Sequence, residues 1–247
     1  HPQGRPARRG HLPAYTDGIL SEHLTRDVSR AIAAAKPDWK VLVFPQLAVG
    51  TSGSNELGSK FSFAGTYAVR PSTLRSVYMD LASELGEQGF KWILVTHVHG
   101  APWHNHVIDQ AGDFFHETYG GQMVHLWGLV PVLSAWGKAM QSMTPEEKKE
   151  DGVSLHAGMD ETSLMLYLRP KLVSREYAKA PAVAGATMEG AFQTAGRENW
   201  PGYLGSPRLG TAEWGRKIWG ALSAAAAEHA LKVLNGADPK QFTRYAD

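Results

Sequence analysis

The chain of 247 residues contains no cysteine. This absence excludes disulfides, iron–sulfur clusters, thiolate zinc sites and cysteine nucleophiles. A bound metal ion would have to be held by histidine, aspartate or glutamate side chains. The lack of cysteine does not decide the compartment, because both cytosolic and exported enzymes can do without it.

An excess of charge of one sign is also absent, since the formal net charge is +1. The charge balance therefore predicts neither a nucleic-acid partner nor a membrane-surface partner. No apolar run approaches the roughly 18–20 residues of a membrane span. The opening residues HPQGRPARRG are polar and basic, without the apolar core of a signal peptide. The compartment is left open between the cytoplasm and export.

The chain does have enough apolar residues, 43%, for a sizeable core in one large domain or two small ones. We expect a single domain over residues 1–247, because no internal repeat and no linker divides the sequence. Apolar spacing predicts helices from Asp17 to Pro37, from Ser72 as N-cap to Gly89, and over about 105–119, 161–168 and 211–234. Short β-rich runs predict strands at Lys40–Phe44, Trp92–Val95 and Met123–Leu129.

Between these elements, residues 145–151 are expected to form an exposed loop or a helix start, and Pro181–Pro207 a long irregular segment. Strands that alternate with helices are typical of a mostly parallel sheet covered by helices on both faces. The sequence therefore predicts an α/β fold.

Four of the eleven histidines follow the strand Trp92–Val95 within a few residues. Ligands bind at the carboxyl ends of strands in such sheets, and alternate residues of an extended segment point the same way. His97 and His99 could therefore converge on one site, and we interpret His99 as a metal ligand. His104 and His106 are interpreted first as surface or helix-capping residues.

Two further clusters combine histidine with carboxylates at element boundaries, in HLPAYTD (His11–Asp17) and HAGMDETS (His156–Ser163). Each has an ordinary explanation. Asp17 could be a helix N-cap, Glu161 could favour a helix dipole, and His156 could be a loop histidine. Taken together, the three clusters supply the nitrogen and oxygen ligands that suit Zn²⁺ or Mn²⁺.

The order of these motifs resembles the creatininase family of amidohydrolases. HLPxxTD comes first, then a strand that ends in a His-Gly turn, then HAGxxETSxML and finally GSPRxGTAExG, which together span His11 to about Gly215. The resemblance implies a three-layer α/β/α fold with a mostly parallel central sheet, a one- or two-metal centre and a homo-oligomer, often a hexamer. It also implies that the metal ligands are Asp17, His99 and Glu161, and that His156 takes part in catalysis. GTY (Gly65–Tyr67) is similar to a family turn near the site.

The chain departs from the family pattern in several places. The family opens with E-Q-H-G-P-H-L-P, whose Glu and first His bind metal, whereas Pro6 and Arg8 stand at those positions here. With a short insertion, His1 could replace the first His. The leading strand that precedes this motif in the family is missing from the sequence. The family's Asn is His97, and Ala101 and Met159 stand where relatives carry acids.

These departures favour a single metal site of Asp17, His99 and Glu161, with His11 and His97 as further candidate ligands. The ion would be Zn²⁺ or Mn²⁺, or else Fe²⁺, because ligand type does not separate them. We expect hydrolysis of a C–N amide, lactam or formamide bond other than a peptide bond, by a metal-activated water. His156 would protonate the leaving nitrogen, because imidazole titrates near neutral pH.

The substrate is expected to be a small-molecule amide, selected by the loops Gly50–Phe63 and Pro181–Pro207. Trp103, Trp127 and Trp136 are candidates for a pocket wall, although core packing is the commoner role for each. The alternative is a catalytically impaired protein that kept the fold as a binding or scaffold subunit, and the loss of the N-terminal ligands favours this alternative.

Overall fold

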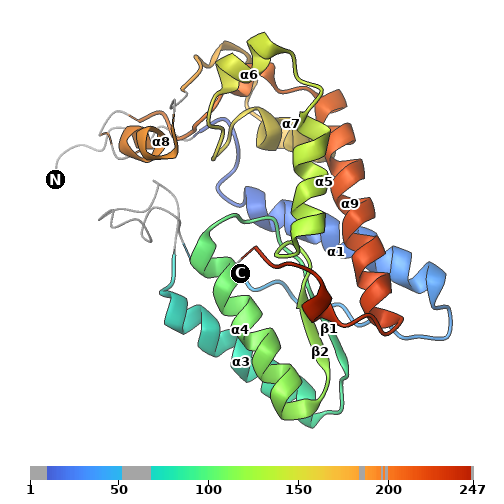
Figure 1. The fold of residues 1–247 in the computed structure, drawn as a ribbon. Coiled ribbons are helices and arrows are strands. Elements are labelled where there is room, and N and C mark those ends of the chain that lie inside the picture. The colour runs from blue at the N-terminus through green and yellow to red at the C-terminus, as the bar shows by residue number, and fades with distance from the viewer. Residues whose placement is uncertain (1–9, 52–67, 184–186, 196, 198–199, 246–247) are drawn as a thin grey trace. The chain divides into compact units, whose positions relative to one another are not determined.

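The computed structural model describes residues 10–51, 68–183, 187–195, 197 and 200–245 (Figure 1). The chain forms two compact units. Unit 1 comprises His1–Thr16, Gly58–Thr66 and Lys138–Gly220, and unit 2 comprises Asp17–Leu57, Tyr67–Gly137 and Ala221–Asp247. The organisation of residues 1–247 as one creatininase-like domain stays a prediction.

Within its described residues, unit 2 is built around a two-stranded parallel sheet. Strand β1 (Trp92–Val95) pairs with β2 (Gln122–His125) in a register that sets Trp92 opposite Gln122 and Val95 opposite His125. Helix α4 (Pro102–Tyr119) connects the two strands (Figure 1). The strand predicted at Trp92–Val95 is confirmed at both ends. The one predicted at Met123–Leu129 is confirmed only up to His125, because the chain then turns into helix α5 (Val130–Met140).

Helices α3 (Pro71–Glu87) and α4 pack against each other and against the sheet, and together they form the core of unit 2. The predicted periodicity of α3 is confirmed. The helix begins two residues earlier than expected, with Arg70 as N-cap and Pro71 in the first turn, where a missing N–H costs nothing. The buried residues of this core are Leu74, Tyr78, Ala82, Val107, Ile108, Ala111, Phe115 and Met123. Burial of each large apolar side chain contributes about 1.5–3 kcal/mol.

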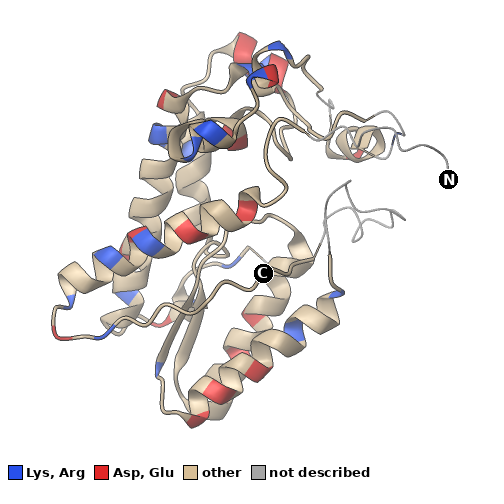
Figure 2. Cartoon of the chain, turned by 180° about the vertical axis from the view of Figure 1, so that it is seen from behind, with Lys and Arg blue, Asp and Glu red and all other residues tan. Residues whose placement is uncertain are grey.

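Helix α1 (Thr16–Ala35) confirms the first predicted helix, and its stripe Leu20, Leu24, Val28 and Ile32 is buried. Along its remaining surface, acidic and basic residues are interspersed (Figure 2). Thr25 Oγ1 lies 2.5 Å from Thr96 Oγ1, which joins α1 to the residue after β1. The last helix, α9 (Ala212–Leu234), also agrees with its prediction and is followed by the 3-10 turn η4 (Pro239–Gln241). Among the described residues, the unit boundaries fall within α1, α5 and α9.

The strand predicted at Lys40–Phe44 is wrong. The segment forms no ladder with any described residue, and Leu42, Val43 and Phe44 are 51–62% exposed. An isolated bridge between Gly50 and Ala68 follows it. A run of apolar, β-branched residues favours an extended backbone. A strand forms only when a second backbone is available to hydrogen-bond with it, and sequence periodicity does not show whether one is.

Unit 1 is made of short helices. A capping box at Thr144 and Glu147 starts α6 (Pro145–Asp151), so residues 145–151 are helical throughout. Helix α7 (Met159–Leu168) confirms the prediction around Glu161, and α8 (Met188–Ala195) lies within the segment predicted to be irregular. The described part of unit 1 also contains three 3-10 turns, namely η1 (Pro170–Leu172), η2 (Arg175–Lys179) and η3 (Pro207–Leu209). Among the described helices, none combines the length and apolar character that a membrane span requires.

Candidate functional site

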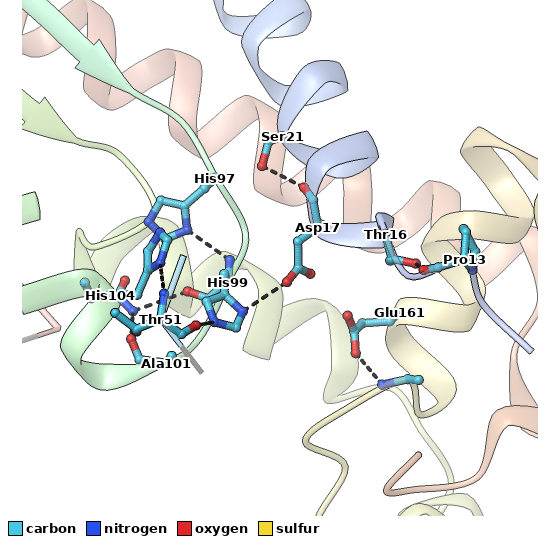
Figure 3. A network of polar contacts seen from close by, with 12 residues as sticks. Pro13, Thr16, Asp17, Ser21, Thr51, His97, His99, Ala101, His104 and Glu161 are labelled. Atoms are coloured by element: carbon cyan, nitrogen blue, oxygen red, sulfur yellow. Dashed lines mark hydrogen bonds and ion pairs between the residues drawn. The ribbon is translucent and has the colours of Figure 1, made fainter. Parts of the chain in front are cut away.

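In unit 2, the sequence-predicted ligands Asp17 and His99 are brought together. Asp17 lies in the first turn of α1, and His99 lies in the loop after β1. His99 Nδ1 is 3.0 Å from Asp17 Oδ2 (Figure 3). Their side chains are 30% and 46% exposed, so the pair is accessible from solvent.

The second ring nitrogen of His99 is also engaged, since Nε2 lies 2.9 Å from the carbonyl oxygen of Thr51. A carbonyl oxygen can only accept, so Nε2 carries a proton and Nδ1 is the nitrogen that faces Asp17. This arrangement matches the second-shell hydrogen bond that orients most metal-binding histidines.

The spacing of the pair agrees with shared coordination of a metal ion. Two ligand atoms about 2.0–2.1 Å from a tetrahedral ion are separated by about 3.3 Å. The observed separation of His99 Nδ1 and Asp17 Oδ2 is 3.0 Å. The pair could therefore accept an ion after a shift of a few tenths of an ångström.

The loop that carries His99 is held from behind by buried side chains. The backbone N–H of His99 donates to His97 Nδ1 at 3.0 Å. Asn105 Nδ2 donates to the carbonyl of Ala101 at 2.7 Å and to that of His99 at 3.3 Å. The Nδ1 atom of His97 is therefore bonded to the loop backbone, whereas the Nδ1 atom of His99 faces Asp17.

His97 belongs to a buried group of three histidines that the sequence did not predict. Its ring stacks on His125 at 4.4 Å and meets His104 edge-on at 4.6 Å. Burial is the main cause that lowers the pKa of both His97 and His104 well below the usual value, and the neighbouring histidines add to it. His125 Nδ1 lies 3.5 Å from Asp109 Oδ1.

The surface interpretation of His104 is therefore wrong, because its side chain is buried against His97 and His99. His106, on the same helix, is half-buried, lies edge-on to Trp103 and is bonded to Gln110. A strand histidine such as His125 carries no signal in the sequence that distinguishes it from a core residue.

The other predicted site residues lie in unit 1. His11 is buried, and its Nε2 is 2.6 Å from Thr162 Oγ1. Its Nδ1 has no hydrogen-bond partner within the part of the chain that the structure describes. Burial, and then the neighbouring His156, lower the pKa of His11 to about 4. Its ring contacts Tyr203 edge-on at 5.7 Å. A neutral, hydrogen-bonded His11 serves packing in unit 1.

His156 lies in the loop before α7. Its carbonyl accepts from the backbone N–H of Leu204 at 2.7 Å, which pins the loop to the GSPR segment. Its half-buried ring lies 5.8 Å from that of Trp200. Trp200 is itself fixed, because its indole N–H donates to the carbonyl of Tyr203 at 2.8 Å.

Glu161 stands in the first turn of α7, and its Oε2 accepts a short hydrogen bond from the backbone N–H of Ala157. Ala157 has a φ of 48°, which is uncommon for a residue with a side chain. The carboxylate and the left-handed residue next to His156 therefore form one local unit. Residues held in such conformations cluster at functional sites.

Several of the sequence-based expectations cannot be placed. His1, Pro6, Arg8 and the turn Gly65–Tyr67 lie outside the described residues. Within the described ranges, no three histidine, aspartate or glutamate side chains converge into a group that could hold a metal ion. Three tryptophans were candidates for a pocket wall. Of these, Trp127 is buried against Trp136, as core packing requires, and Trp103 is 47% exposed.

Comparison with known proteins decides the ancestry of the chain. The sequence model of the creatininase family, described as creatinine amidohydrolase, matches residues 9–230. The chain belongs to the creatininase family. A relative from Mycobacterium ulcerans (strain Agy99), named mycofactocin precursor peptide peptidase, is 26% identical over 226 residues, which are 88% of this chain and 78% of the relative.

Solved creatininases share the fold. One described as creatininase Mn has a TM-score of 0.63 at 21% identity, over 92% of this chain and 87% of that chain. A mutant creatininase of Zn-Zn type has a TM-score of 0.61 at 21% identity, over 92% and 86% of the two chains. The α/β creatininase-like fold expected from the sequence is thus confirmed.

Proposed function

We propose that the protein is a metal-dependent hydrolase that cleaves a C–N amide bond, with a divalent ion for which Asp17 and His99 supply ligands. Glu161 stays the third ligand that the family resemblance implies. The observation that carries the proposal is the His99 ring, with Nε2 bound to the Thr51 carbonyl and Nδ1 directed at Asp17. An imidazole held in this way presents one defined nitrogen to a cation.

The donor set suits Zn²⁺ or Mn²⁺, with Fe²⁺ as a third choice, because imidazole and carboxylate ligands accept all three. Solved family members described as creatininase Mn and as Zn-Zn type support the first two ions. When bound, such an ion lowers the pKa of a coordinated water toward ~7 and polarises a carbonyl oxygen.

The residues of this chain supply the remaining chemistry. Asp17 provides negative charge that balances the cation, and the Thr51 carbonyl keeps the His99 ring from rotating. His156 delivers a proton to the leaving nitrogen, with its ring supported by Trp200. His11 and His97 act as supports, since each already commits one ring nitrogen to Thr162 or to the His99 backbone.

The comparisons favour two different substrates for this hydrolysis. The description of the family model favours a small cyclic amide such as creatinine, in agreement with the expected non-peptide substrate. The name of the mycobacterial relative favours a peptide. Incubation with creatinine and with mycofactocin precursor peptide, followed by mass spectrometry of the products, separates the two.

The test of the proposal combines metal content with activity. Protein purified with added Zn²⁺ or Mn²⁺ is expected to hold stoichiometric metal, and His99→Ala is expected to lose both metal and hydrolysis. His106→Ala, in helix α4 after the His99 loop, is the matched control and should retain both, because His106 bonds to Gln110 instead. If wild type holds no metal and His99→Ala changes neither quantity, the proposal fails and a binding or scaffold role takes its place.

We also propose a homo-oligomer, with a hexamer as the expected form. The exposed apolar residues Leu42, Val43 and Phe44 support the proposal, because exposed clusters of this kind commonly mark association surfaces. Light scattering coupled to size exclusion measures the mass directly. A monomer mass of 26.9 kDa at all concentrations would contradict it.

A further inference from the structure

The ring orientation of His99 depends on a backbone group rather than on a side chain. The carbonyl of Thr51, which accepts from His99 Nε2 at 2.9 Å, belongs to an irregular segment. A carbonyl in such a segment can orient an imidazole only if its own backbone is held in place. The residues that fix Thr51 therefore contribute to the position of His99.

His104 is the side chain that holds Thr51 from within unit 2. The backbone N–H of Thr51 donates to His104 Nδ1 at 3.4 Å, while the Thr51 carbonyl accepts from His99 (Figure 3). Both backbone polar groups of Thr51 thus engage histidines. The His104 ring also meets the His99 ring edge-on at 5.1 Å, so it limits the tilt of His99 directly.

The local backbone is shaped to allow this contact. A Cβ at Gly50 would lie 3.0 Å from both Cε1 and Nδ1 of His104, so the His104 ring would have to shift by a few tenths of an ångström. The Gly50 carbonyl accepts from the Val69 backbone N–H at 2.9 Å, which anchors the segment on its other side. A glycine at position 50 therefore lets the backbone approach the histidine.

The contact also fixes the tautomer of His104. To accept from the Thr51 N–H, Nδ1 of His104 must keep its lone pair, so the proton of the neutral ring lies on Nε2.

We propose that His104 is a positioning residue that acts through the Thr51 backbone to hold His99 with Nδ1 toward Asp17, ready for a metal ion. The proposal rests on the proposed function, in which His99 is a metal ligand. It adds a residue that does not itself bind the ion, and a glycine that makes room for it.

The experiment uses three substitutions of these two residues and one control. His104→Leu keeps the bulk but removes the acceptor, whereas His104→Asn places an amide oxygen near the position of Nδ1. Gly50→Ala displaces the His104 ring while leaving it intact. His106→Leu is the matched control on the same helix, since His106 bonds to Gln110 instead. Urea midpoints verify that each variant is folded.

The first readout is ¹⁵N NMR of the His99 imidazole in the metal-free protein. Wild type and His104→Asn are expected to show Nε2 protonated and protected from exchange, and His104→Leu and Gly50→Ala are expected to lose that protection. The second readout is calorimetric titration with Zn²⁺ and with Mn²⁺. His104→Leu and Gly50→Ala should bind about 10-fold more weakly, as for other residues that orient a metal ligand. His104→Asn and His106→Leu should remain close to wild type.

The proposal is overturned if His104→Leu leaves both the His99 signal and the metal affinity unchanged, or if His106→Leu weakens binding as much. Should His104→Leu not fold, Gly50→Ala and His104→Asn decide the question by the same criteria. Wild-type protein that binds neither ion would refute the proposed function, whereas the NMR of the metal-free protein would still test whether His104 positions His99.

Discussion

The buried His11 makes a quantitative prediction about acid sensitivity. In the folded chain the pKa of His11 is lowered from its ordinary value of 6.5 to about 4, mainly because burial disfavours the charged ring. A histidine with a lowered folded pKa contributes its full stability above pH 6.5, where it is neutral in both states. That contribution is lost as the pH falls below 6.5, and the loss levels off near pH 4.

The magnitude follows from the two pKa values. The difference between 6.5 and about 4 corresponds to about 3 kcal/mol, and about 2 kcal/mol of this is lost by pH 5. His11 is only 7% exposed, so solvent screening does not reduce the figure greatly. His11→Gln can keep the bond to Thr162 through its amide, in place of Nε2, but cannot be protonated.

Urea unfolding of wild type and His11→Gln, followed by tryptophan fluorescence at pH 7.5 and pH 5, measures the effect. Wild type is expected to lose about 2 kcal/mol more than His11→Gln between the two pH values. Thr162→Val, which removes the hydroxyl partner, should lower stability at both pH values by about 1 kcal/mol. Parallel losses in wild type and His11→Gln would refute the assignment of a buried, neutral His11.

Two further predictions concern the packing of unit 1. Gly215→Ala should destabilise the folded protein by more than ~3 kcal/mol, because the new Cβ would lie 1.9 Å from the Ser163 carbonyl oxygen. Gly220→Ala, on the same helix, is the control. Its Cβ would meet nothing within 4 Å, so this substitution should stabilise the folded protein by about 0.5–1 kcal/mol. Thermal and urea unfolding compare the pair, and equal effects would contradict the close contact of α7 with α9. Asp151→Ala should cost about 2 kcal/mol, because it strands the buried N–H of Ser206, now 2.6 Å from Asp151 Oδ1, while Asp151→Asn retains an acceptor and should cost less. Indistinguishable urea midpoints for the two variants would show that this bond does not matter.

The sequence by itself determined the features that depend on neighbours along the chain. The stripe of α1 from Leu20 to Ile32 and the limits of β1 follow from spacing and from local turn residues. The motifs around Asp17, His99 and Glu161 were sufficient to indicate the creatininase family, which the match over residues 9–230 confirmed.

Only the tertiary structure decided which atoms of these residues are used. It committed His99 Nε2 to Thr51 and buried His104, where the sequence suggested a surface residue. It also left Lys40–Phe44 without a described ladder partner, despite a strand-like pattern. The physical reason is the same in each case. Ring orientation, burial and strand pairing depend on groups that lie tens of residues away along the chain. The spacing of apolar residues within one segment does not reveal these contacts or their free energies.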